Sequence, residues 1–251
     1  MRHPSNFLAL TAVSLLALLP ATAQDKKKPP EPRVIFSLPL GVVPGKTTKL
    51  TLRGALLDEA KEVRVDHGSV KLLTKGKAGV PDKNPEKVGD TQVEVELNLP
   101  PDFRGEAVSL VVVTPKGETK PHRVLVESLL SIISEKEGND GFRTAQTIAV
   151  PVVIEGTIGR AKDVDVFRIE GKRGQKLTAE VQASRLGAPL DARLTLYIAD
   201  GQQLAANDDF TSEHRDARIE LTLPTDGVYY LSLIDAHDSG SALHVYRLVV
   251  R

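Results

Sequence analysis

Oxygen-bearing side chains gather in two short segments of this chain, residues 134–140 (SEKEGND) and residues 162–167 (KDVDVF), each lying just before an expected β-strand. Residues two positions apart in an extended segment point to the same side. The first segment therefore presents oxygens on one face from Glu135, Glu137 and Asn139, with Asp140 just beyond. Ca²⁺ takes about six to eight oxygen ligands in flexible geometry. One calcium ion shared by the two segments is the first prediction, and it indicates a calcium-organised extracellular β-module.

A structural interpretation of the same residues stays open. Residues 141–146 (GFRTAQ) predict a short helix, and Asn139 or Asp140 is a typical N-cap for it. In that case the two side chains cap a helix instead of binding a cation. Asp165 alternates with apolar neighbours and faces away from their side, so the pair Asp163 and Asp165 also fits a solvated strand edge.

Two further polar loops carry weaker signals. A second cation site, or simply a turn, is expected from Asn207, Asp208 and Asp209, with Asp191 as a possible fourth ligand. Asn and Asp side chains bond their own backbone in turns, so both interpretations stay open here. The segment from Asp235 to Asp238 is more typical of a turn.

Catalytic patterns are absent from the sequence. There is no HExxH pair, no GxSxG elbow, no glycine-rich phosphate loop and no cysteine, which removes thiol catalysis and cysteine zinc sites. A chain without Trp and with 4% aromatic residues is a poor sugar-stacking surface. The chain is therefore expected not to be an enzyme. Tyr229 and Tyr230 face opposite sides of one strand, so one is expected in a core, and the other, with Tyr197 or Tyr246, is a candidate protein-binding surface.

The first residues are typical of a secretory signal. A weakly basic start precedes an apolar run, and Ala21-Thr-Ala23 offers a small-x-small cleavage pattern, so residues 1–23 are predicted to be a signal peptide. The run is too short for the roughly 20 residues of a membrane-spanning helix. Residues 24–32, rich in Lys and Pro, predict a solvated leader. The mature chain is expected to be secreted or periplasmic, without membrane insertion. Zero net charge argues against nucleic-acid binding.

The rest of the chain has the two-residue periodicity of β-strands, punctuated by Gly, Pro, Asn and Asp, which predicts an all-β protein of two β-sandwich domains. Strands are expected at residues 48–53, 92–99, 107–113, 164–169, 176–181, 193–198, 218–223, 228–233 and 243–250. Residues 75–90 lack periodicity and predict a long exposed loop. The domains are expected at 33–127 and 128–251, with an acidic linker at 134–140. Residues 129–133 (LLSII) predict either a strand or an interdomain patch.

The second half resembles the bacterial pre-peptidase C-terminal domain, a jelly-roll-like sandwich appended to secreted enzymes and related to the collagen-binding domains of clostridial collagenases. The motifs that carry the resemblance are Glu135-x-Glu-x-Asn-Asp140, Gly159-x-x-x-Asp-x-Asp-x-Phe167, Asn207-Asp-Asp209 and Gly227-x-Tyr-Tyr230. By position, the resemblance implies these calcium ligands: Glu135, Glu137, Asn139, Asp140, Asp163 and Asp165. The chain departs from the family at Gly138, where Pro is usual, so ordering the linker costs more entropy here.

The first half more loosely resembles an immunoglobulin-like (IPT/TIG) domain of bacterial surface proteins. The resemblance rests on turn motifs: residues 39–45 (PLGVVPG), 50–54 (LTLRG) and 113–117 (VTPKG). Such domains act as spacers or binding platforms. Together, the two halves predict a secreted, non-catalytic binding or scaffolding protein whose partner is an extracellular protein or polymer. The alternative is an accessory domain of a secreted peptidase, or a peptidase itself.

Overall fold

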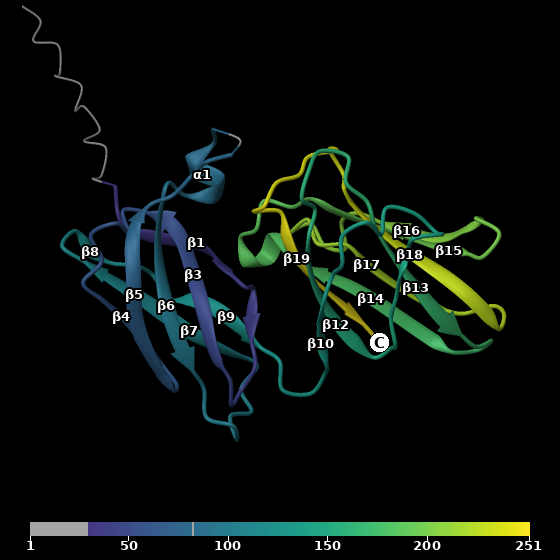
Figure 1. Cartoon of the computed structure of the whole chain (residues 1–251), viewed down its shortest axis with the longest axis horizontal. Coiled ribbons are helices and arrows are strands. Elements are labelled where there is room, and N and C mark those ends of the chain that lie inside the picture. Colours follow the sequence, from purple (N-terminus) through teal and green to yellow (C-terminus); the bar gives the residue numbers. More distant parts are fainter. Residues whose placement is uncertain (1–29, 82) are drawn as a thin grey trace, which may run out of the picture. The chain divides into compact units, whose positions relative to one another are not determined.

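The computed structural model describes residues 30–81 and 83–251, and strands dominate them (Figure 1). The all-β sandwich prediction is confirmed. The predicted signal peptide (1–23) lies outside the described residues, as does the predicted leader except for residues 30–32. No helix in the described part of the chain is long and apolar enough to cross a membrane.

The N-terminal sandwich is made by the strands between residues 33 and 126. They are β1 (Arg33–Leu38), β2 (Gly41–Val42), β3 (Thr47–Ala55), β4 (Glu62–Val65), β5 (Ser69–Lys77), β6 (Thr91–Asn98), β7 (Ala107–Thr114), β8 (Gly117–Glu118) and β9 (His122–Val126). One sheet has the order β1-β3-β6-β5, and the other has the order β2-β9-β7-β4 with β8 paired to β7. A single helical turn, α1 (Pro85–Val88), lies between β5 and β6.

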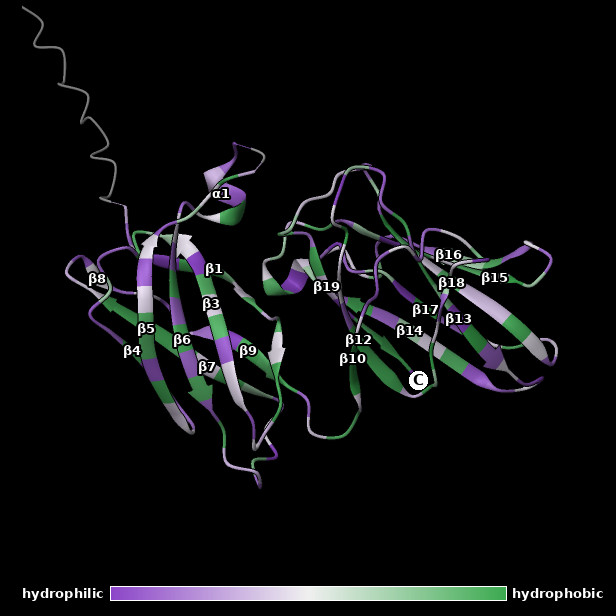
Figure 2. Ribbon diagram, viewed as in Figure 1, coloured by the Kyte–Doolittle hydropathy of each residue, from purple (hydrophilic) through white to green (hydrophobic). Residues whose placement is uncertain are grey.

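The alternation of buried and half-exposed residues along the strands explains how the two sheets of this sandwich pack together. Along β6, hydrophobic residues are buried and the polar residues between them are half-exposed, and the same alternation is visible in Figure 2. Val93 and Val95 of β6 share a core with Leu110 and Val112 of β7, which lies in the other sheet. Burying one face of each sheet against the other removes apolar surface from water, which is the main favourable contribution to folding.

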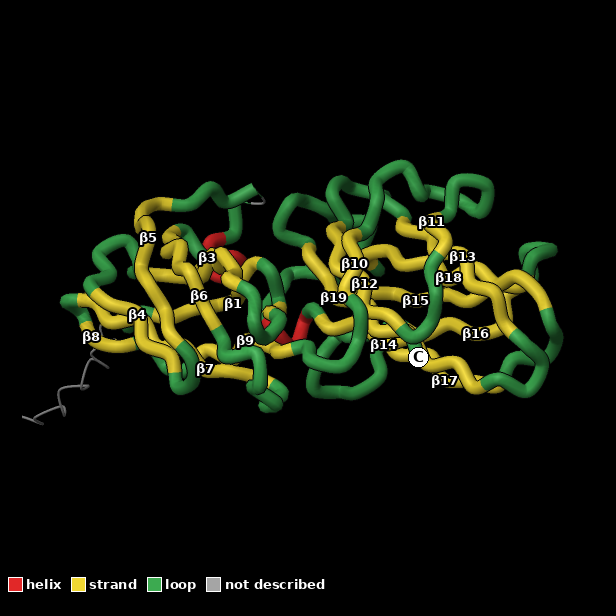
Figure 3. The backbone as a smooth tube through the Cα atoms, turned by 60° about the horizontal axis from the view of Figure 1, so that its bottom comes forward, coloured by secondary structure: helices red, strands yellow, loops and turns green. Residues whose placement is uncertain are grey.

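The C-terminal sandwich is made by the strands between residues 132 and 250. They are β10 (Ile132–Ser134), β11 (Gln146–Thr147), β12 (Val152–Thr157), β13 (Asp165–Gly171), β14 (Lys176–Gln182), β15 (Ala192–Ile198), β16 (Gln203–Asn207), β17 (Arg218–Thr222), β18 (Gly227–Asp235) and β19 (Val245–Val250). The sheet orders are β10-β12-β19-β14-β17 and β11-β13-β18-β15-β16. The short strands β10 and β11 each pair in parallel with the edge of a different sheet (Figure 3).

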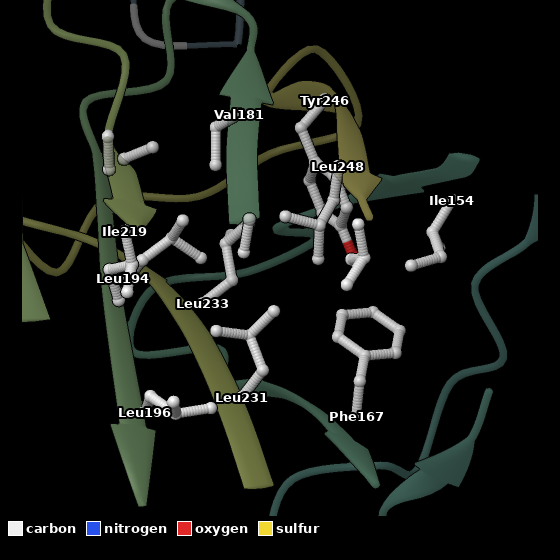
Figure 4. Close-up of a cluster of buried hydrophobic side chains, with 14 of the residues drawn as sticks. Ile154, Phe167, Val181, Leu194, Leu196, Ile219, Leu231, Leu233, Tyr246 and Leu248 are labelled. Atoms are coloured by element: carbon white, nitrogen blue, oxygen red, sulfur yellow. The ribbon is translucent and has the colours of Figure 1, made fainter. Parts of the chain in front are cut away.

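The core of this sandwich takes side chains from both sheets. Ile154, Tyr246 and Leu248 come from one sheet, and Phe167 and Leu231 come from the other (Figure 4). All are almost completely buried. A short 3₁₀ turn, η1 (Ser184–Leu186), follows β14.

Three local predictions need correction. Every strand predicted from alternation is present, but the predicted helix at residues 141–146 is a turn, in which Thr144 N–H donates to the Gly141 carbonyl (3.0 Å). The predicted loop at residues 75–90 is shorter, because β5 extends to Lys77 and α1 interrupts the rest. Within residues 129–133, a strand begins only at Ile132. Glu31–Arg251 forms one compact unit by its contacts, so the separate folding of the two halves stays a prediction.

Candidate functional site

The acidic linker crosses from one sheet of the C-terminal sandwich to the other. It leaves β10, and Glu135 N–H donates to the Glu155 carbonyl of β12 (2.8 Å). Asn139, four residues after Glu135, accepts a hydrogen bond at its carbonyl from Val166 N–H of β13 (3.0 Å). The chain then forms the turn at 141–144 and pairs with β13 as β11. These backbone bonds bring the side chains of the linker to the edge of the sandwich where both sheets end.

Oxygen atoms converge on the side chain of Asn139, which is 1% exposed. One of the two terminal atoms of its side-chain amide lies 3.2 Å from Glu135 Oε1, 3.2 Å from Asp165 Oδ1 and 3.3 Å from the Lys136 carbonyl oxygen. If the amide nitrogen occupies this position, its two N–H groups face all three oxygens. If the amide oxygen occupies it, four oxygens face one another, and a proton on one of the carboxyl groups or a cation must satisfy them. Both arrangements place Glu135, Asn139 and Asp165 in one cluster.

Asp165 is buried, so its interpretation as part of a solvated strand edge is wrong. It shares the core-facing side of β13 with Phe167, which lies two positions on, and only 1% of its surface is exposed. Tyr246 O–H donates to Asp165 Oδ2 across 2.6 Å, so Tyr246 is a buried support and not the surface residue that the sequence suggested. Burial, with repulsion from Asp163 and Glu137, raises the pKa of Asp165 to about 7 against the lowering effect of Tyr246.

Asp163 is also 1% exposed. Its Oδ2 accepts Gly159 N–H (2.7 Å), while its Oδ1 is buried without a hydrogen-bond partner. Arg160 Nη2 lies 3.2 Å from that Oδ1, an ion pair without hydrogen-bond geometry, and it donates to Asp140 Oδ2 (2.9 Å). A Cβ atom added at Gly159 would lie 3.3 Å from Glu137 Oε1 and 3.5 Å from Asp163 Oδ2, so both carboxylates flank this glycine.

The carboxylates of the acidic cluster repel one another. Burial raises the pKa of Glu135 to about 7, and repulsion adds to the effect from Asp165, Glu137, Asp163 and Asp140. Repulsion falls off with distance, so these carboxylates are close neighbours. As the side chains lie, however, no three Asp, Glu or His residues in the described ranges are arranged to hold a metal ion.

Sequence reasoning missed three residues of this site. Arg160 neutralises two of the carboxylates, and only its spacing three residues before Asp163 hinted at this role. Gly156 leaves room for the cluster, because a Cβ atom there would lie 2.3 Å from the Tyr246 hydroxyl and 2.7 Å from Glu135 Cβ. The Lys136 carbonyl is a backbone group, which no residue pattern reveals.

Beside the acidic cluster, three aromatic rings meet on the outer side of the β13-β18-β15 sheet. Tyr197 and Tyr230 are cross-strand neighbours, and Tyr229, which alternates with Tyr230, is buried in the core. Phe142 from the turn at 141–144 stacks on Tyr230 with ring centroids 4.3 Å apart and planes within 5°. It also contacts Tyr197 at 5.3 Å. The sequence had placed Phe142 in a helix.

The second candidate cation site does not assemble in the described residues. Asp191 pairs with Arg215 (2.8 Å) and lies 3.3 Å from His237 Nδ1. Asn207 accepts a backbone N–H from Arg218 and donates to the Asp209 carbonyl, as expected of a turn. The turn predicted from Asp235 is confirmed, since its Oδ1 accepts N–H bonds from residues 237 and 239.

Comparison with known proteins bears on this half of the chain. Residues 163–234 match the bacterial pre-peptidase C-terminal domain. The resemblance is thereby confirmed for that segment, whereas the IPT/TIG-like interpretation of the first half stays a prediction. A probable subtilase-type serine protease of Deinococcus radiodurans is 35% identical over 119 residues, which is 45% of this chain. The match spans only 16% of that protease.

Two solved structures are similar at low sequence identity. The pre-peptidase C-terminal domain of a collagenase from Bacillus anthracis is 15% identical, with 43% of this chain and 94% of that domain covered and a TM-score of 0.35. PliG from Aeromonas hydrophila, a periplasmic inhibitor of g-type lysozyme, is 16% identical, with 49% and 97% covered and a TM-score of 0.34. Scores this low carry no conclusion about function.

Proposed function

We propose that this chain is an exported, non-catalytic binding protein whose C-terminal sandwich is stabilised by one calcium ion at the acidic cluster. The observation that supports the proposal is the gathering of Glu135 and Asp165 around Asn139, with one carboxylate oxygen of each 3.2 Å from its amide. The predicted ligands are Glu135, Glu137, Asn139, Asp140, Asp163 and Asp165, with the Lys136 carbonyl added. Ca²⁺ prefers oxygen ligands, and carboxylates are common among them.

The residues fit such an ion on two counts. Asp163 Oδ1 is a buried carboxylate oxygen that pairs with Arg160 Nη2 (3.2 Å) but has no hydrogen bond, so it still has a lone pair to offer an ion. Burial raises the pKa of Glu135 and of Asp165 to about 7, and repulsion from neighbouring carboxylates adds to both shifts, so a bound cation would stabilise their charged forms. Since the side chains as they lie do not form a closed cage, binding requires them to rotate toward one point. The exposed side chain of Glu137 is free to make that movement.

Calcium binding is tested by calorimetry and by melting the mature chain with calcium or with chelator. Extracellular calcium modules bind at about 10⁻⁴–10⁻³ M. With about 1 mM free calcium, linkage then stabilises the folded state by about 0.4–1.4 kcal/mol, a shift of a few degrees in the melting temperature. Magnesium should substitute poorly, because it requires a tighter octahedral shell.

Matched variants separate this site from non-specific binding. The double substitution Asp163→Ala/Asp165→Ala should abolish both the binding heat and the melting shift. Asp238→Ala is the control: Asp238 is an exposed acid in a turn of the same sandwich, and its loss should leave both unchanged. If wild-type melting ignores chelator and calorimetry detects no calcium, the cluster is an amide-bridged structural feature and the proposal fails.

For the partner, we propose an extracellular protein that contacts the surface formed by Phe142, Tyr197 and Tyr230. Tyr and Trp are enriched among the residues that contribute most to protein interfaces, and Arg168, the cross-strand neighbour of Tyr230, carries a guanidinium group that pairs with Glu170 (3.1 Å). Binding of purified extracellular proteins, compared between wild type and Tyr230→Ala, tests this assignment. Binding of polysaccharide but not of protein would contradict it.

A second candidate function is supported by the relative that is a subtilase-type protease. In this case the chain is an accessory domain of a secreted peptidase, or a peptidase itself. Assays of the mature chain on casein, gelatin and chromogenic esters distinguish these functions. Turnover that a single Ser or His substitution abolishes would refute the non-catalytic proposal.

A further inference from the structure

Leu129 is the most exposed large hydrophobic residue in the described part of the chain, with 87% of its surface accessible to solvent. It lies in residues 127–131, which connect β9 to β10 (Figure 1). A single exposed leucine is common on protein surfaces, so the surroundings of Leu129 decide whether it has a role. Two features set it apart: its backbone is held in place, and its neighbours form a surface that is partly apolar and partly basic.

The side chain of Glu127 holds the backbone of this turn. Glu127 Oε1 accepts the N–H groups of both Leu129 and Leu130, each at 2.9 Å. Its Oε2 lies 3.7 Å from the guanidinium of Arg247, whose side chain is almost completely buried. The backbone N–H of Glu127 donates to the Val42 carbonyl (2.9 Å). Leu129 is therefore presented on a fixed turn, which lowers the entropy lost when a partner binds to it.

Apolar residues of the N-terminal sandwich continue the surface beside Leu129. Val43, Pro44 and Pro101 line the same hollow as Leu129. Pro101 is exposed, and Val43 and Pro44 are half-buried. A Cβ atom added at Gly45 would lie 3.3 Å from Pro101 Cβ, so the turn that carries Pro44 packs against Pro101. These residues make a contiguous apolar patch, and such patches with polar rims mark sites of protein interaction.

The rim of this patch is basic. A second hollow that Leu129 lines contains five arginines and three glutamates, and two of these arginines are paired with two of the glutamates. Arg104, which lines both hollows, donates to the backbone carbonyls of residues 101 and 103 (3.0 Å each) and to no carboxylate. Arg123 is exposed and makes no ion pair with any residue that the structure describes. Two guanidinium groups are therefore available to carboxylates of a partner.

We propose that Leu129 anchors a docking site for an acidic segment of a partner protein. Apolar side chains of the partner cover Leu129, Pro44 and Pro101, and its carboxylates pair with Arg104 and Arg123. Charge complementarity of this kind speeds association and fixes the register of the partner. A sulfated or uronic polysaccharide, in contrast, engages the arginines and leaves Leu129 in water. The site uses neither the acidic cluster nor the aromatic surface, so it does not depend on the proposed function.

The probe is a phage-displayed library of random linear peptides, selected on the full mature chain and counter-selected on Leu129→Ser. Because Leu129 is exposed in the free protein, this substitution should leave the melting temperature unchanged. The peptides that remain should carry Asp or Glu beside apolar residues. Fluorescence anisotropy of synthetic copies should show affinity weakened by about ten- to a hundredfold in Leu129→Ser, the factor that burial of a leucine side chain contributes.

Variants of the rim supply an independent measurement. Arg104→Gln and Arg123→Gln should each weaken peptide binding by about two- to fivefold at low salt, and about 0.5 M salt should remove this difference. Arg173→Gln and Phe210→Ser are the controls, because both residues are exposed and neither lines the two hollows. Tyr230→Ala, in the aromatic surface, should also bind these peptides with wild-type affinity, which separates this site from the proposed function.

Four results would overturn the proposal. Counter-selection that leaves no peptide shows that Leu129 anchors nothing, and peptides without acidic residues show that the arginines play no part. Heparin binding that requires Arg104 and Arg123, without any peptide that requires Leu129, identifies a polysaccharide site instead. Sedimentation that finds a wild-type dimer and a monomeric Leu129→Ser protein identifies a second copy of this chain as the occupant.

Discussion

Replacing Asp165 by Asn should stabilise the calcium-free protein at neutral and alkaline pH. Asp165 is almost fully buried, and its pKa rises from 3.8 to about 7. The folded state therefore holds this proton more tightly than the unfolded state does. The stability that this proton contributes is fully present below pH 3.8 and is lost as the pH rises toward 7. Asn keeps the shape and still accepts the Tyr246 hydroxyl, but it carries no charge to be buried.

The magnitude follows from the size of the shift. A difference of about three pKa units at about 1.4 kcal/mol per unit gives a gain of about 4 kcal/mol for Asp165→Asn at pH 8. For a protein of this size, that gain corresponds to a rise of roughly ten degrees in melting temperature. At pH 4 the two proteins should melt within a few degrees of each other, because Asp165 is then protonated in the folded state.

The assay is thermal unfolding followed by circular dichroism, with chelator present, between pH 4 and pH 8. Asp209→Asn is the control, since this exposed carboxylate in the same sandwich should show no such pH-dependent gain. Calcium at about 1 mM should narrow the difference at pH 8 by about 0.4–1.4 kcal/mol, because wild type gains from the ion and the variant has lost a ligand. An Asp165→Asn protein that is less stable than wild type at pH 8 in chelator would refute the reasoning, as would a gain independent of pH.

Three further outcomes test the packing. Gly156→Ala should lower the melting temperature and weaken calcium binding, because the new methyl group meets the Tyr246 hydroxyl at 2.3 Å, and calorimetry with melting measures both effects. Asp216→Ala should lower the free energy of unfolding, measured with urea, by about 2–4 kcal/mol, because this buried carboxylate accepts hydrogen bonds from the backbone N–H groups of residues 183–185. Asp216→Asn should retain part of that stability. Burial lowers the pKa of His122 to about 4, so the stability contributed by its neutral form is fully present above pH 6.5 and is lost as the pH falls toward 4. His122→Leu should therefore make the free energy of unfolding fall less steeply between pH 6.5 and pH 4. The same pH dependence in both proteins would contradict this prediction.

The sequence by itself predicted nine of the strands and the acidic residues that the linker and β13 bring close together. Alternation of period two identifies a strand wherever one face is buried and the other is wet, and β6 and β18 follow it closely. Strands β1, β5, β9, β12 and β16 were not predicted. In the edge strand β5 the alternation is weak, because Val70 and Leu72 are half-buried whereas Leu73 is exposed. The acidic residues were identified because oxygens clustered in two segments of the chain have few purely structural uses.

Only the tertiary structure decided the environment of those residues. Alternation shows which residues share a face but not what covers that face. One interpretation of the sequence therefore placed Asp165 at a solvated strand edge, although it is buried and Tyr246, a residue 81 positions away, donates a hydrogen bond to it. The helix expected at 141–146 depends on local propensity, and the pairing of the following residues with β13 and the stack of Phe142 on Tyr230 outweigh it. Contacts between segments far apart in sequence have no local signal, and here they set both the burial of the carboxylates and the position of the rings.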